Sequence, residues 1–150
     1  MAQSLSLEER IDRLEAESAI ARLIHRYAAL IRADRPDEVA ALFLPDGSFD
    51  IRDGDPDLPD FHRRSLLEGR AAIHAHLAPN KGKPHPLPLI HNLSVEVVGD
   101  EAVANSVMEA QIYGSSHKVI GEYHDRLRRA DGQWYFAARR YTIFRRGSST

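Results

Sequence analysis

The stretch Lys118–Arg146, KVIGEYHDRLRRADGQWYFAARRYTIFRR, decides how the rest of the chain has to fold. It predicts two strands joined by the tight turn Ala130–Gln133, because Asp-Gly between alternating apolar runs is the strongest short-range hairpin signal. Val119 and Leu127 mark one face of the first strand, on which every second side chain lies. A ribbon with one apolar face has to be covered, and helical segments earlier in the chain are the expected cover.

Composition restricts the class of protein. The 150 residues are 43% hydrophobic and 28% charged, which is typical of one globular domain, here taken as residues 1–150. The net charge of −2 gives no basic field for nucleic acid or anionic lipid. Because the sequence contains no cysteine, thiol catalysis is excluded, and the composition is compatible with a reducing compartment. No signal-type or bilayer-spanning apolar run is found, so we expect a soluble cytoplasmic protein that is not bound to a membrane.

The N-terminal part predicts helices. Ser6-Leu7-Glu8-Glu9 has the pattern of a capping box, so a helix is expected to begin there. From Ile20 to Ile31 the apolar positions recur at helical spacing and form one buried stripe. The polar patch Glu15–Ser18 is expected to separate a short lead helix from the main one. Pro36 should end the main helix near Ala33 and begin a second.

The central part predicts two loops, a helix and the rest of a sheet. The second helix should stop at Pro45-Asp46-Gly47, before a short strand at Ser48–Ile51 and an acidic loop. A third helix is expected at Leu66–Ala78, followed by the irregular loop Pro79–Pro88, interpreted as a flap at a cavity mouth. The later strands are predicted at Leu89–Val98, Ala102–Tyr113, Val119–Arg128 and Tyr135–Phe144. Helices followed by an antiparallel meander indicate an α+β fold.

Five short patterns in this order resemble a known family. They are Ala19-Ile20 with Arg26-Tyr27-Ala28, Asp37–Phe43 with Asp46-Gly47, Gly69-Arg70 with Ile73, Val95-Glu96-Val97 with Gly99-Asp100, and Gly121–Leu127 with Asp131-Gly132, Trp134 and Arg139. Together they resemble SnoaL-like proteins of the nuclear transport factor 2-like superfamily, over roughly Glu8 to Phe144. The resemblance implies a cone-shaped barrel of a curved, mostly antiparallel sheet covered by three N-terminal helices, with a deep apolar pocket. It also implies a homodimer formed through the outer sheet, or a higher homo-oligomer.

His91 and Tyr27 are the first candidates for catalysis. His91 shares strand parity with Leu93 and Val95, so it should point at the helix-covered face. The similar dehydratases carry a histidine in this stretch as general base, a role that a neutral imidazole in an apolar pocket suits. The resemblance makes Tyr27 a pocket tyrosine. Both residues could instead be ordinary core side chains.

The acidic partner of the histidine is the main departure from the family pattern. In the related dehydratases an aspartate orients the histidine, and counting without a gap puts Arg32 at that place, with Asp34 two residues later. Asp34 is either a catalytic residue of a remodelled helix end or the cap of the next helix. Arg32, if it points inward, would bind an oxyanion of the substrate.

The C-terminal strand and its neighbours supply further candidates. Trp134, Phe136, Ala138 and Arg140 share one parity of the last strand, yet the family pattern favours Arg139 as the arginine near the pocket floor. Tyr123 is expected near the pocket, and Asp125 is expected to pair with a neighbouring arginine. The remaining candidate contacts to substrate are Phe49, Asn92 and Gln111, with Glu109 and His124 as weaker ones.

Metal and cofactor sites are not predicted. His74 and His76 diverge on a helix because they are two residues apart, and His62, His85 and His117 are scattered. We also find no phosphate-binding loop, nucleophile elbow or base-stacking platform in the sequence.

The leading hypothesis is therefore a cofactor-independent lyase, which eliminates water or performs a retro-aldol cleavage on a hydrophobic cyclic or aromatic small molecule. His91 would move the proton, with Tyr27 and an arginine stabilising the oxyanion. One alternative is a non-catalytic small-molecule-binding protein. The other is a steroid-type isomerase or polyketide cyclase, which needs a carboxylate in the pocket from Asp34, Asp50, Glu109 or Asp125.

Overall fold

The computed structural model describes residues 4–112 and 114–144. In chain order the elements are α1 (Leu7–Arg32), α2 (Pro36–Ala40), β1 (Phe43–Gly54), β2 (Phe61–Glu68), α3 (Arg70–Leu77), the 3₁₀ turn η1 (Ala78–Asn80), β3 (Pro86–Val98), β4 (Glu101–Ile112), β5 (Lys118–Ala130) and β6 (Gln133–Phe144). The expected strand end at Tyr113 and the last two residues of the deciding stretch, Arg145 and Arg146, lie outside the described residues.

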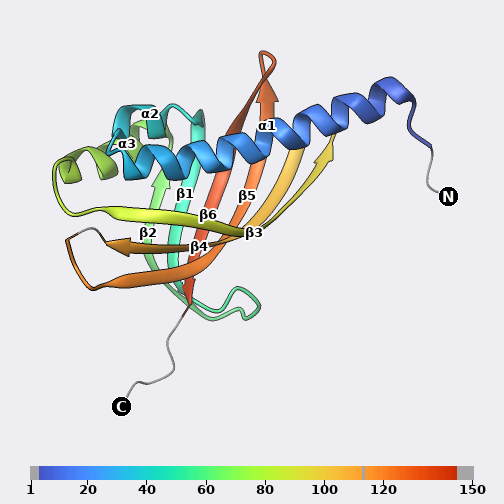
Figure 1. The fold of residues 1–150 in the computed structure, drawn as a ribbon. Coiled ribbons are helices and arrows are strands. Elements are labelled where there is room, and N and C mark those ends of the chain that lie inside the picture. Colours follow the sequence, from blue (N-terminus) through green and yellow to red (C-terminus); the bar gives the residue numbers. More distant parts are fainter. Residues whose placement is uncertain (1–3, 113, 145–150) are drawn as a thin grey trace.

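The strands form one curved sheet in the order β2-β1-β6-β5-β4-β3. The β1–β6 pair is parallel and the other pairs are antiparallel. Figure 1 shows α1 lying across one face of this sheet, with α2 and α3 at one end of the same face. The predicted α+β class, with three helices on a curved sheet, is confirmed. No helix among the described residues has the length and apolar character needed to cross a membrane.

The predicted hairpin is present at β5–β6. Ala130 pairs with Gln133, and both turn residues have positive φ, 51° at Asp131 and 76° at Gly132. Such a turn matches the twist of the two strands it joins. Val119 through Leu127 lie with alternate side chains toward α1, so the parity predicted for β5 is correct.

Helix α1 begins with the predicted capping box. The hydroxyl of Ser6 accepts from the backbone N–H of Glu9, and the Glu9 carboxylate accepts from the N–H of Ser6, both at 3.1 Å. The expected break at Glu15–Ser18 is wrong, because the helix continues to Arg32. Its stripe is buried from Ala16 onward, whereas the first turns extend past the sheet and leave Leu14 exposed.

The segment between α2 and β3 differs most from the prediction. Strand β1 begins at Phe43, and residues 61–68, the last three of which were expected to begin a helix, form β2 on its edge. Helix α3 therefore starts at Arg70 instead of Leu66, after Gly69 with φ of 94°. Pairing with β1 overrides the local apolar pattern of Leu66 and Leu67, which carries no strand signature by itself.

Candidate functional site

A cavity of about 860 Å³ lies between α1 and the concave face of the sheet. Its walls come from α1, α3, strands β1 to β6 and the turn before β5, and most of its lining is apolar. The sheet supplies these side chains because alternate residues of each strand face the helices. The cavity lies toward the end of the sheet where β3 begins, and Pro86 and Pro88 of β3 form part of its wall.

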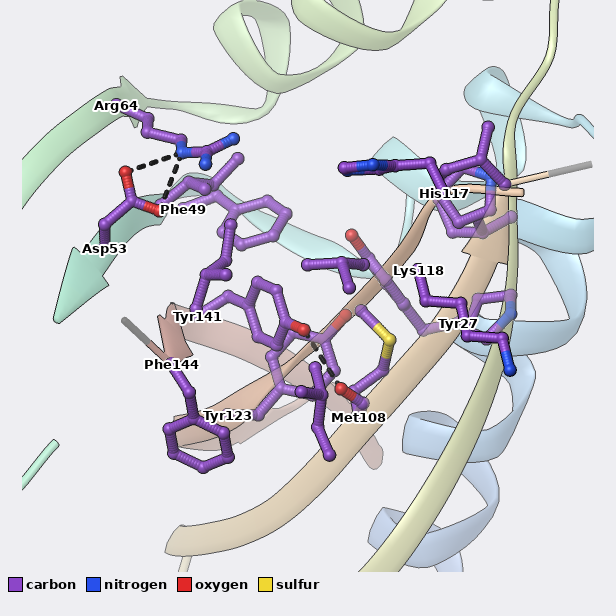
Figure 2. Close-up of a pocket in the computed structure, with 18 of the residues that line it drawn as sticks. Tyr27, Phe49, Asp53, Arg64, Met108, His117, Lys118, Tyr123, Tyr141 and Phe144 are labelled. Carbon is purple, nitrogen blue, oxygen red and sulfur yellow. Dashed lines mark hydrogen bonds and ion pairs between the residues drawn. The ribbon is translucent and has the colours of Figure 1, made fainter. Parts of the chain in front are cut away.

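Three tyrosines line this cavity: Tyr27 from α1, Tyr123 from β5 and Tyr141 from β6. The rings of Tyr123 and Tyr141 lie 4.8 Å apart, and Tyr27 meets Tyr123 edge-on at 6.3 Å. The Tyr141 hydroxyl donates to the carbonyl of Met108 at 2.9 Å, as Figure 2 shows. Within the described residues the Tyr27 and Tyr123 hydroxyls make no hydrogen bond. The predictions that Tyr27 and Tyr123 face the pocket are correct in geometry.

Burial keeps these tyrosines neutral. It raises the pKa of Tyr27, Tyr123 and Tyr141 above the usual value near 10, against the opposing pull of the nearby Arg139 guanidinium. A phenol of this kind donates a hydrogen bond and does not act as a base at neutral pH. Tyr27 is therefore suited to hold a substrate oxygen.

Arg139 lies under the tyrosines and does not line the cavity. Its guanidinium carbon is 3.4 Å from the ring centre of Tyr123 and 4.2 Å from that of Tyr27. Its Nε lies 3.0 Å from Oδ1 of Asp125, and both side chains are fully buried. Burial raises the pKa of Asp125 to about 6, although Arg139 lowers it. The inward orientation predicted for Arg139, and its pairing with Asp125, are correct.

A bulge in β6 is the reason that Arg139, and not Arg140, faces inward. Leu127 pairs with Phe136 but Arg126 pairs with Ala138, so β6 carries one extra residue. An extra residue reverses the parity of everything that follows it. The parity expected for Ala138 and Arg140 is therefore wrong.

A second bulge places His91 on the outer face of the sheet. His91 pairs with Val107 and Ser94 with Asn105, so β3 also has an extra residue, and Asn92 there has a φ of 52°. The parity shared with Leu93 is lost, and the predicted inward orientation of His91 is wrong. Its side chain is 44% exposed, and its Nε2 lies 2.8 Å from the carboxylate of Glu109.

Four other predicted contacts also lie outside the cavity lining. Asn92 is exposed at the bulge, and Gln111 is exposed and donates to the carbonyl of Ser115 at 3.3 Å. Arg32 is exposed at the end of α1. Asp34 caps no helix, since Arg35 is the N-cap of α2. Phe49, by contrast, lies in the cavity wall as expected.

Asp34 instead forms a hydrogen bond with the loop that leads into β3. Its carboxylate accepts from the backbone N–H of Gly82 at 2.6 Å. In the same loop both ring nitrogens of His85 face carbonyl oxygens, that of Lys83 at 2.9 Å and that of Arg32 at 3.0 Å. These carbonyls raise the pKa of His85, because only the protonated ring can donate to both.

Polar side chains gather on part of the cavity wall that the sequence did not single out. Asp53 of β1 and Arg64 of β2 form an ion pair, and His62, His76, His117 and Lys118 also line the cavity. His62 and Arg64 lie on strand β2, which the sequence interpretation missed, and Asp53 lies on β1 beyond the predicted strand Ser48–Ile51. Tyr141 was also missed, although it stands two residues after Arg139 and so shares its face. Among the described residues no group of three potential ligands could hold a metal ion.

Comparisons with known proteins agree with this architecture. A family model described as a SnoaL-like domain matches residues 12–140. The solved structure of Rv3472, a Mycobacterium tuberculosis protein of unknown function, is 25% identical, covering 95% of this chain and 80% of its own, with a TM-score of 0.75. A proposed scytalone dehydratase from Novosphingobium aromaticivorans is also 25% identical. The match covers 87% of this chain and 85% of the dehydratase chain, with a TM-score of 0.69.

More distant similarity concerns the fold alone. An NTF2-like protein with a cystatin-like fold, also from N. aromaticivorans, is 20% identical over 99% of this chain and 94% of its own, with a TM-score of 0.74. A sequence search of curated proteins found no match. Because this family model matches residues 12–140, which are most of the sequence, the chain belongs to the SnoaL-like domain family.

Proposed function

We propose that this protein binds a hydrophobic, cyclic or aromatic small molecule in the cavity between α1 and the sheet. The observation that carries the proposal is the cavity itself, about 860 Å³ and mostly apolar, with rings on its wall. A volume in this range accommodates a ligand of a few fused rings. The hydroxyls of Tyr27 and Tyr123 offer two hydrogen bonds to an oxygen of such a ligand.

Binding of a neutral fluorescent probe, N-phenyl-1-naphthylamine, tests the proposal. Ile51→Trp should narrow the cavity, because Ile51 lines it, and should weaken the increase in fluorescence. Val98→Trp is the matched control, since Val98 is exposed at the far end of β3. Equal binding by wild type and Ile51→Trp, with an unchanged fold by circular dichroism, would refute binding in this cavity.

A second candidate function is a cofactor-independent lyase, which eliminates water or a small fragment from a molecule bound in the cavity. Three imidazoles on the wall support it, because His62, His76 and His117 have no ring hydrogen bond within the described residues and can exchange protons. Tyr27 would hold the departing oxygen. The related proposed scytalone dehydratase makes this reaction class the natural one to assay.

Histidine variants separate this lyase from the original hypothesis about His91. With a hydroxylated fused-ring substrate, one or more of His62→Asn, His76→Asn and His117→Asn should lose at least about 100-fold in kcat, the usual worth of a general base. His91→Asn should retain turnover because it lies on the outer face. Loss in His91→Asn alone would contradict the assignment. The isomerase or cyclase alternative gains no support, since Asp53, the only carboxylate among the described lining residues, is held by Arg64.

We also propose that two copies pair through the outer sheet face. Val103 and Ile120 are exposed there, while Nε of Arg52 and of Arg140 are buried without a partner in the described chain. A second copy would cover the two exposed apolar side chains and supply hydrogen-bond partners to the two arginines. Light scattering should give twice the 16.9 kDa chain mass. Val103→Arg should yield the monomer.

A further inference from the structure

The polar groups of the cavity come largely from the edge pair β1–β2. Asp53 pairs in register with His62, and Arg64 follows two residues later on the same face. Arg63, between them, points the opposite way and binds Asp50. One strand thus presents two adjacent arginines to opposite sides of the sheet.

The hydrogen bonds of Arg64 leave most of its donors unused. Its Nε lies 2.9 Å and 2.8 Å from the two oxygens of Asp53. The terminal nitrogens carry four further N–H groups, and no described residue accepts from them. Figure 2 shows these nitrogens directed away from Asp53. Asp53 therefore fixes the side chain while the open end of the guanidinium is free to bind a ligand.

The hydrogen-bonding groups of the lining favour an anionic ligand. Among the described lining residues the one carboxylate, Asp53, is compensated by Arg64. A cationic or purely donor-rich ligand would find few acceptors here, whereas carboxylate oxygens would meet several donors.

We propose that the ligand is an amphipathic ring compound whose carboxylate is held by Arg64; this rests on the small-molecule binding proposed above. The planar guanidinium fork matches a carboxylate in a two-point contact. The ring system of the ligand then lies over the apolar wall toward Tyr141. Arg64 is 55% exposed, so the contact is screened and we expect about a tenfold preference for the acid over a neutral isostere.

Binding of 2-naphthoate and of its neutral isostere 2-naphthamide, measured by calorimetry at 50 mM salt, tests the proposal. Wild type should bind the acid about ten times more tightly, and Arg64→Gln should bind both alike. Arg64→Lys, which keeps the charge and loses the fork, should retain part of the preference. Arg63→Gln is the matched control on the opposite face and should behave like wild type.

Each other outcome has a definite meaning. Equal affinity of wild type for acid and amide, or a preference that survives in Arg64→Gln, overturns the carboxylate assignment. So does binding of the amide without binding of the acid. If wild type binds neither compound nor the neutral naphthylamine probe, small-molecule binding itself fails, and the ligand class with it.

Discussion

The buried ion pair of Asp125 and Arg139 should dominate the response of this fold to mutation. Both side chains are fully buried, and the guanidinium also packs on the rings of Tyr27, Tyr123 and Phe136. Arg139→Met keeps an unbranched chain against those rings but leaves the carboxylate without its counter-charge. We expect it to lower the free energy of unfolding by about 3–5 kcal/mol at neutral pH, the usual cost of breaking a buried pair.

Removal of both charges should cost far less than removal of one. A well-packed apolar replacement of a buried pair is often neutral or stabilising, because the desolvation penalty of both ions disappears. We expect Asp125→Leu combined with Arg139→Met to lie within about 2 kcal/mol of wild type. Arg35→Met, which breaks the exposed pair with Glu38, is the control and should cost less than about 1 kcal/mol.

The pH dependence follows from the direction of the Asp125 shift. Its pKa is raised from 3.8 to about 6, so the folded state binds this proton more tightly than the unfolded state. The stabilisation is complete below about pH 4 and is lost as the pH rises through about 6, a decrease of about 3 kcal/mol. In Arg139→Met the opposing pull is gone, so the decline should extend to higher pH. The double variant should lack this component.

Chemical denaturation followed by the fluorescence of Trp134, the single tryptophan, measures all of these quantities. Each variant is unfolded in urea between pH 4 and pH 8, and the difference from the double variant isolates the contribution of Asp125. A cost below about 1 kcal/mol for Arg139→Met, or a double variant no more stable than Arg139→Met, would refute the reasoning.

Three further predictions concern the backbone and the loop beside the cavity. Gly121→Ala should destabilise the fold by more than about 2 kcal/mol in urea denaturation, because the new Cβ would lie 2.3 Å from the carbonyl oxygen of Thr142; a wild-type midpoint would contradict this. Asn92→Val should cost about 1–2 kcal/mol in thermal unfolding while Asn92→Gly costs little, since φ there is positive; equal costs would argue against the bulge. Tryptic cleavage in the loop 81–85, taken relative to cleavage of an unstructured peptide at the same pH, should accelerate as the pH rises through the pKa of His85, which is raised above the usual 6.5, because only the protonated ring makes both hydrogen bonds. His85→Gln should remove this pH step, and a step that persists would exclude His85 as its source.

Local signals in the sequence account for much of the framework. Asp131-Gly132 predicts the β5–β6 hairpin because its residues tolerate the positive φ that the turn needs, and Ser6 with Glu9 predicts the start of α1. The stripe that carries Tyr27 and the alternation that carries Tyr123 both follow from regular periodicity. In these places the direction of each side chain follows the regular period of its helix or strand, because pairing with a distant segment inserts no extra residue.

Tertiary structure alone decided which polar groups reach the cavity. The bulge at Asn92 turns His91 outward, the bulge before Ala138 turns Arg139 inward, and pairing with β1 converts the segment of Arg64 into a strand. Parity arguments assume an uninterrupted period of two, and one residue inserted against a partner strand reverses every later side chain. Pairing partners distant in sequence set such insertions, so the sequence determined the framework and the three-dimensional pairing determined the site.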